Sequence, residues 1–69
     1  MKYRDFVRVL TDHNFSDDRQ RGSHHQFEGY VDGVRKLVTV DYSQLGEDIS
    51  PKNLASMIRQ SGLPKRLFR

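Results

Sequence analysis

The sequence predicts an α+β fold of the order α-β-β-β-α, in which two helices cover one face of a three-stranded antiparallel sheet. Three observations predict it. The chain opens with a helical apolar stripe, its middle alternates with period two between two turn signals, and its last third carries clear helix start and stop signals. A single domain is expected over residues 1–69 because the chain is too short for two.

The first helix is predicted over residues 2–13. Its apolar residues recur at spacings of three and four, which places them on one helical face: Tyr3, Phe6, Val7 and Leu10. Asn14 tolerates the left-handed backbone conformation and is expected to end this helix.

Three strands are predicted over residues 17–21, 24–31 and 34–42. Gly22-Ser23 suits a type II′ turn, and Asp32-Gly33 suits a type I′ turn, the stronger hairpin signal. The first strand contains Asp17-Asp18, which are poor strand formers, so it is expected at an edge of the sheet.

The last helix is expected to follow a polar loop over residues 43–49. Ser50 suits the N-cap, Pro51 suits the first helical position, and Gly62 suits a left-handed C-cap. Ile49 and Leu54 occupy the positions of a hydrophobic staple. Residues 63–69 form a basic tail that is expected to be mobile.

The turns predict a register. A two-residue loop at Asp32-Gly33 pairs Val31 with Val34, and counting back from there pairs His24 with Asp41. Alternation then assigns one face to the helices, with Phe27, Val38, Val40 and His25. The opposite, open face is expected to carry the polar residues His24, Gln26, Thr39 and Asp41, joined from the first strand by Arg19 and Arg21.

Composition narrows the class of function. Twelve Lys and Arg against nine Asp and Glu give a net charge of +3 and a pI near 9.6, which favours a polyanionic partner such as nucleic acid. The chain has no cysteine, which excludes disulfides and thiolate zinc sites. No apolar run approaches the roughly 20 residues that span a bilayer, and the N-terminus lacks a signal-peptide pattern. A cytoplasmic protein without a membrane partner is therefore expected.

The open-face residues suit RNA cleavage. His24 would exchange protons near neutral pH. Arg19 and Arg21, together with Gly22 and Ser23 of the turn, would bind the RNA backbone and support the negative charge of the transition state. Asp41 is a candidate to orient the imidazole. This route needs no metal or other cofactor. His25 points the other way and is expected to be a packed, hydrogen-bonded residue.

The run Gly22-Ser23-His24-His25-Gln26-Phe27 resembles the GSHH-x-F signature of HicA toxins, the mRNA interferases of HicA/HicB toxin–antitoxin systems. A Leu-Val-Thr-Val strand and a closing Ile-x-x-Ser-Gly helix extend this resemblance over nearly the whole chain. It implies a fold like that of double-stranded RNA-binding domains and RNA cleavage through the histidine after Gly22-Ser23, which is His24. It also implies a HicB-like antitoxin that covers the active face, and inhibition of translation by the free toxin.

Two other functions remain open. A non-catalytic RNA-binding module would share the fold order, the charge and the open face, although Lys52 is the only lysine in the first turn of the last helix, where such modules use several. The third hypothesis is a protein-interaction domain that binds a partner through its tail, Leu67-Phe68-Arg69.

Overall fold

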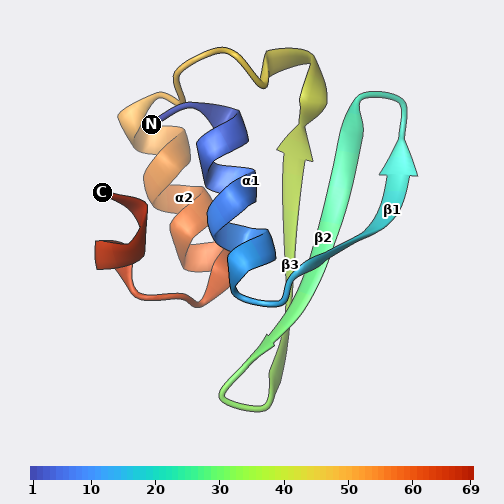
Figure 1. Ribbon diagram of the computed structural model, residues 1–69, viewed down its shortest axis with the longest axis vertical. Helices are drawn as coiled ribbons and strands as arrows, with labels where there is room; N and C mark the ends of the chain where they lie inside the picture. The colour runs from blue at the N-terminus through green and yellow to red at the C-terminus, as the bar shows by residue number, and fades with distance from the viewer.

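A computed structural model describes the whole chain, residues 1–69, and its ribbon is drawn in Figure 1. The helices and strands follow in the order α1 (Tyr3–Asp12), β1 (Ser16–Arg21), β2 (His24–Val31), β3 (Val34–Asp41), the 3₁₀ helix η1 (Tyr42–Gln44), α2 (Pro51–Ser61) and the 3₁₀ helix η2 (Lys65–Phe68). The α-β-β-β-α order is confirmed, and the predicted ends of the first helix and the strands differ from the observed ones by one residue at most.

The sheet has the strand order β1-β2-β3 and is antiparallel throughout. The predicted register is confirmed, because Val31 pairs with Val34 and His24 pairs with Asp41. Asp32 and Gly33 have φ angles of 53° and 78°, as both central residues of a type I′ turn require. The other hairpin turn has a positive φ, 59°, at Gly22 only, as a type II′ turn requires.

One feature of β1 was not predicted. The register shifts between Asp17, which pairs with Phe27, and Arg19, which pairs with Gln26. Asp18 is therefore an extra residue on this strand, as in a β-bulge. Because a one-residue shift reverses the face to which a side chain points, Asp17 lies on the helix side of the sheet instead of beside Arg19.

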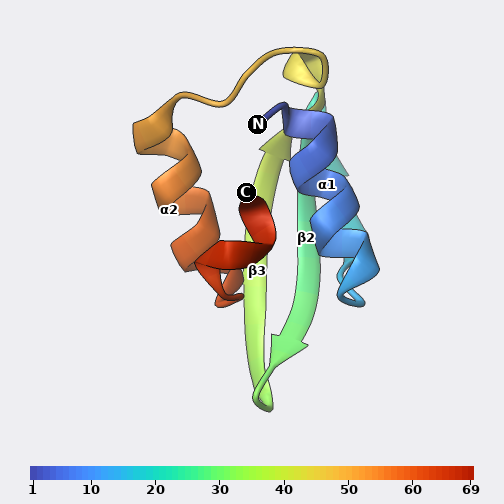
Figure 2. The ribbon, with the colours of Figure 1, turned by 60° about the vertical axis from the view of Figure 1, so that its left-hand side comes forward.

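Both helices pack on the face that the sequence predicts, and Figure 2 shows α1 lying over the sheet and α2 standing along β3. The strands β1 and β3 are the two edges of the sheet, and α2 packs along β3, so α2 lies on the side of the sheet away from β1. The core they enclose contains ten buried residues: Tyr3, Phe6, Leu10, Phe15, Phe27, Val38, Val40, Ile49, Met57 and Phe68.

The loop between β3 and α2 caps the start of α1. Lys2, at the N-cap of α1, makes no side-chain capping bond. The backbone N–H groups of Tyr3 and Arg4 instead donate to the carbonyls of Glu47 and Leu45, each at 3.0 Å. These bonds satisfy donors that the first turn of a helix leaves without partners.

The ends of α2 follow the predicted signals. Ser50 Oγ accepts the N–H of Asn53 at 3.3 Å, and Gly62 has a φ of 70°. At the C-terminal end, the fully buried hydroxyl of Ser61 donates to the carbonyl of Ile58 at 2.7 Å and accepts the N–H of Leu63 at 3.1 Å. Ser61 thus links the last turn of the helix to the segment that follows.

The expectation of a mobile tail overlooked an aromatic anchor. Residues 65–68 form η2, and Phe68 is only 4% exposed. Its ring stacks on that of Phe6 with centroids 4.7 Å apart and an angle of 24° between the planes. The C-terminal segment returns to the core through the burial of this ring, and Leu63 and Leu67 pack against the same core.

Candidate functional site: an exposed histidine between strands

His24 is the first residue of β2 and directly follows the Gly22-Ser23 turn. Its side chain is exposed to solvent. Since β2 is the middle strand, His24 has a neighbour on each side, Arg21 on β1 and Asp41 on β3. The ring is therefore accessible from the open face while its backbone is held by two strands.

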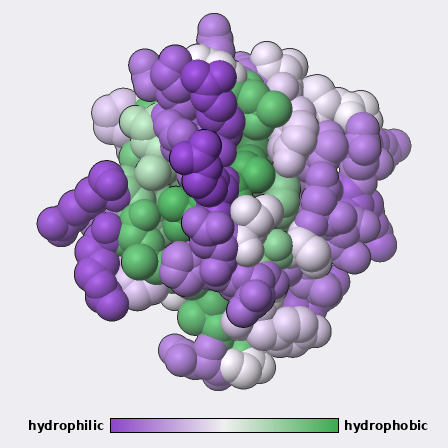
Figure 3. Space-filling view, in the orientation of Figure 1, coloured by the Kyte–Doolittle hydropathy of each residue, from purple (hydrophilic) through white to green (hydrophobic).

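A polar pocket of about 210 Å³ brings the predicted residues together. It is lined by Arg19, Arg21, His24, Gln26 and Thr39, and none of these is hydrophobic. Figure 3 shows that the side of the molecule that carries β1 is hydrophilic, whereas the hydrophobic surface lies in patches on the helix side, to either side of a hydrophilic stripe.

The two arginines of this pocket are free to bind an anion. The salt bridges of the chain join His25 to Asp17 and Arg35 to Glu28, so neither Arg19 nor Arg21 is engaged by a carboxylate. The bulge contributes to this, since it removes Asp17 from the open face. The result is two uncompensated guanidinium groups beside one imidazole, an arrangement suited to a phosphodiester.

Asp41 lies opposite His24 but is hydrogen-bonded to Ser43. Its Oδ1 accepts the Ser43 hydroxyl at 2.7 Å and the Ser43 N–H at 3.0 Å. These two bonds, with smaller contributions from the Ser23 hydroxyl and the charge of His24, lower the pKa of Asp41. No hydrogen bond joins this carboxylate to the His24 ring, so its role in orienting the imidazole stays a prediction.

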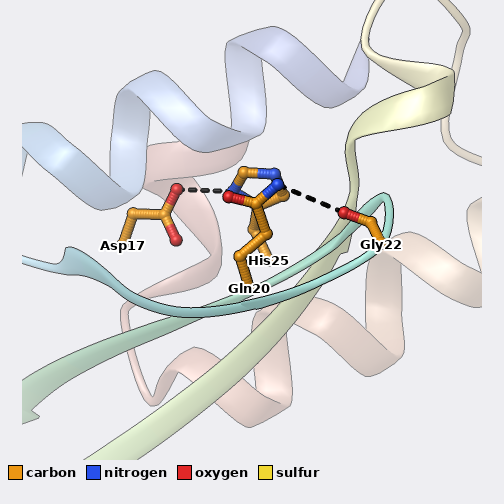
Figure 4. A network of polar contacts seen from close by, with 4 residues as sticks. All are labelled: Asp17, Gln20, Gly22 and His25. Carbon is orange, nitrogen blue, oxygen red and sulfur yellow. Dashed lines mark hydrogen bonds and ion pairs between the residues drawn. The ribbon is translucent and has the colours of Figure 1, made fainter.

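His25 is a structural residue on the opposite face, as predicted. Its Nδ1 lies 2.5 Å from Asp17 Oδ2, and its ring stacks on Tyr42 with centroids 3.6 Å apart and planes 10° apart. Figure 4 shows the Asp17 contact together with Gln20, whose Nε2 donates to the Gly22 carbonyl at 3.3 Å. Burial raises the pKa of Tyr42. These contacts fix the strand ends that carry His24.

A second wall of the site was missed from the sequence. A pocket of about 270 Å³ shares His24 and Thr39 with the arginine pocket and extends to α2; its other lining residues are Tyr3, Asp41, Asn53, Ser56, Met57 and Gln60. The polar residues of α2 recur at spacings of three and four, which places them on one helical face. That spacing is visible in the sequence, but only the packing of α2 along β3 puts this face beside His24.

No group of three or more His, Cys, Asp or Glu side chains is arranged to hold a metal ion. The helices are also too short and too polar for any of them to cross a membrane.

The sequence model of a family described as "HicA toxin of bacterial toxin-antitoxin" matches residues 3–63. The chain belongs to the HicA toxin family. This confirms the resemblance predicted from the GSHH run, and HicA membership supports a toxin role and implies an antitoxin partner. No curated protein and no solved structure matched the chain. The matched HicA region contains all three strands and the turn that position His24.

Proposed function

We propose that this chain is an endoribonuclease toxin that cuts mRNA by metal-independent acid–base chemistry at His24 and so inhibits translation. The observation that carries the proposal is an exposed imidazole in one pocket with two guanidinium groups that no carboxylate engages. Membership in a toxin family also supports a catalytic role for His24 over that of an inert surface histidine.

In the proposed reaction, the neutral ring of His24 takes the proton from a ribose 2′-OH. The 2′ oxygen attacks the adjacent phosphorus and the bond to the 5′ oxygen breaks. The leaving 5′ oxygen takes a proton, directly or through a solvent water, from the imidazolium formed in the first step, which returns the His24 ring to its neutral form. The products are a 2′,3′-cyclic phosphate and a free 5′-OH. Arg19 and Arg21 would stabilise the negative charge that develops on the phosphoryl oxygens between these steps.

The turn before His24 would support the phosphate from the other side. Gly22 has its positive φ while a Cβ there would meet no atom within 4 Å, so glycine is needed for its conformation and the turn is open to a ligand. The Ser23 carbonyl accepts the N–H of Tyr42 at 2.7 Å, which fixes the turn against the end of β3. The Ser23 hydroxyl, which helps to lower the pKa of Asp41, would have to turn from that carboxylate to donate to the RNA backbone.

The partner that restrains this activity is proposed to be a HicB-like antitoxin. Its presence on the open face of the sheet would block RNA from both arginines and from His24. The site of action would be the cytoplasm, where mRNA is translated.

The test compares wild type with His24→Ala on a defined RNA in the presence of EDTA. Acid–base catalysis by one side chain contributes about 100- to 10,000-fold, so His24→Ala should lose cleavage by that factor while its circular dichroism spectrum is unchanged. His13→Gln, which alters a histidine outside both pockets, is the matched control and should retain activity.

Product analysis separates this function from its alternatives. Mass spectrometry should find 2′,3′-cyclic phosphate ends, and an RNA with 2′-deoxyribose at the cut position should resist cleavage. RNA binding without any cleavage by wild type would instead favour a non-catalytic RNA-binding module. Equal cleavage by wild type and His24→Ala would refute the role of the histidine.

A further inference from the structure

The pocket between His24 and α2 is chemically unlike the arginine pocket beside it. Its floor contains the buried residues Tyr3 and Met57, each 8% exposed, and its rim carries the polar side chains of Asn53, Ser56 and Gln60. It contains no Lys or Arg, and its one carboxylate, that of Asp41, would repel a phosphate. The pocket is therefore unsuited to the RNA backbone.

The α2 side chains at the rim have hydrogen-bonding capacity to spare. No side-chain hydrogen bond within the chain uses the amides of Asn53 and Gln60 or the hydroxyl of Ser56, although the backbone N–H of Asn53 is bonded to the Ser50 cap. A side-chain amide both donates and accepts, which matches the mixed donors and acceptors on the edge of a nucleobase.

The two pockets meet at His24 and Thr39, which line both. A phosphodiester held at His24 by the arginines would therefore leave an adjacent nucleotide within reach of the α2 wall. An apolar floor with a polar rim suits a flat base, whose ring would lie on Tyr3 and Met57 while its edge meets the amides.

We propose that α2 forms a base-reading wall in which Asn53 and Gln60 select the nucleobase next to the phosphodiester held at His24. The inference rests on the proposed nuclease function and deepens it by assigning sequence preference to a helix that carries none of the charge-stabilising groups. The arginines would supply affinity without regard to sequence, and the amides would supply discrimination.

The experiment uses two readouts. Cleavage of a randomised RNA pool is sequenced for wild type, Asn53→Ala and Gln60→Ala, with Gln44→Ala as the control that removes an amide outside the pocket. The base preference at one position beside the cut should fall toward equal use of the four bases in Asn53→Ala or Gln60→Ala. Gln44→Ala should keep the wild-type preference, and the total cleavage rate of the α2 variants should change less than that of His24→Ala.

Binding of the same pool to His24→Ala protein, alone and combined with each α2 substitution, provides the readout that does not need cleavage. A base preference that disappears with the α2 substitutions supports the wall. A preference left intact in both readouts, or no preference in wild type, overturns it while leaving the nuclease proposal standing. Absence of cleavage by wild type refutes the nuclease proposal, and the binding readout then still decides whether α2 reads a base.

Discussion

The stacking of Phe68 on Phe6 predicts that the C-terminal segment contributes a large share of the free energy of unfolding. Substituting Phe68 with Ala removes a ring that is 4% exposed and packed on a fully buried ring. Phe→Ala in a core costs about 3–5 kcal/mol. A site near the chain end can open to water, which favours the lower end of that range, about 3 kcal/mol.

That loss is large for a chain of this size. At roughly 0.05–0.15 kcal/mol per residue, 69 residues have a total stability of about 3–10 kcal/mol. For a small domain each kcal/mol shifts the melting temperature by roughly 4–8 °C, so Phe68→Ala should lower it by about 12–24 °C. Stability is measured by urea and thermal denaturation followed by circular dichroism.

Two matched variants sharpen this test. Phe68→Leu keeps an apolar side chain but loses the aromatic stacking, so it should recover most but not all of the stability. Arg69→Ala changes the exposed neighbouring residue and should stay within about 0.5 kcal/mol of wild type. If Phe68→Ala behaved like Arg69→Ala, the tail would be frayed in solution and the reasoning from its burial would be wrong.

Three other substitutions test separate parts of the structure. Gly29→Ala would bring a Cβ within 2.6 Å of the Phe15 ring, so it should destabilise by about 1–3 kcal/mol in urea; a gain in stability would contradict this packing. Arg21→Ala should weaken RNA binding and reduce the slope of log affinity against log salt by about 0.7, measured by fluorescence anisotropy, and an unchanged slope would place Arg21 away from the phosphates. Ser43→Ala should raise the pKa of Asp41 in an NMR titration, because the Ser43 hydroxyl is the largest cause of its lowered pKa. A carboxyl group with a lowered pKa stabilises the fold above about pH 4, and this stabilisation is lost as the pH falls through the pKa of the folded state. The stability of Ser43→Ala should therefore depend less on acid pH than that of wild type. An unchanged Asp41 pKa in the variant would refute the assignment.

The sheet and its register could be predicted because two short turns set them. Gly22 and the Asp32-Gly33 pair have the positive φ angles that their turn types need, and each two-residue loop leaves only one pairing of its flanking strands. The face of His24 then follows from alternation. This is why the open-face group of His24, Arg19 and Arg21 could be predicted from the sequence.

The features that were missed depend on contacts between distant segments. The bulge at Asp18 has no local signal, and it places Asp17 against His25, eight residues away. Phe68 stacks on Phe6, which lies near the opposite end of the chain. The third strand ends at Asp41, one residue before the predicted end, because this carboxylate caps the 3₁₀ turn at Ser43.

The neighbouring histidines have a further consequence for how the proposed activity can be lost. His24 is exposed to solvent, whereas the side chain of His25 points to the opposite face, where it is hydrogen-bonded to Asp17 and stacked on Tyr42. His24 and His25 are consecutive residues, so the position of the His24 imidazole is set from the side of the sheet that the helices cover. Selection for harmless variants of this toxin should therefore yield substitutions at Tyr42 or Asp17 as well as at His24, although neither of those side chains would ever touch RNA.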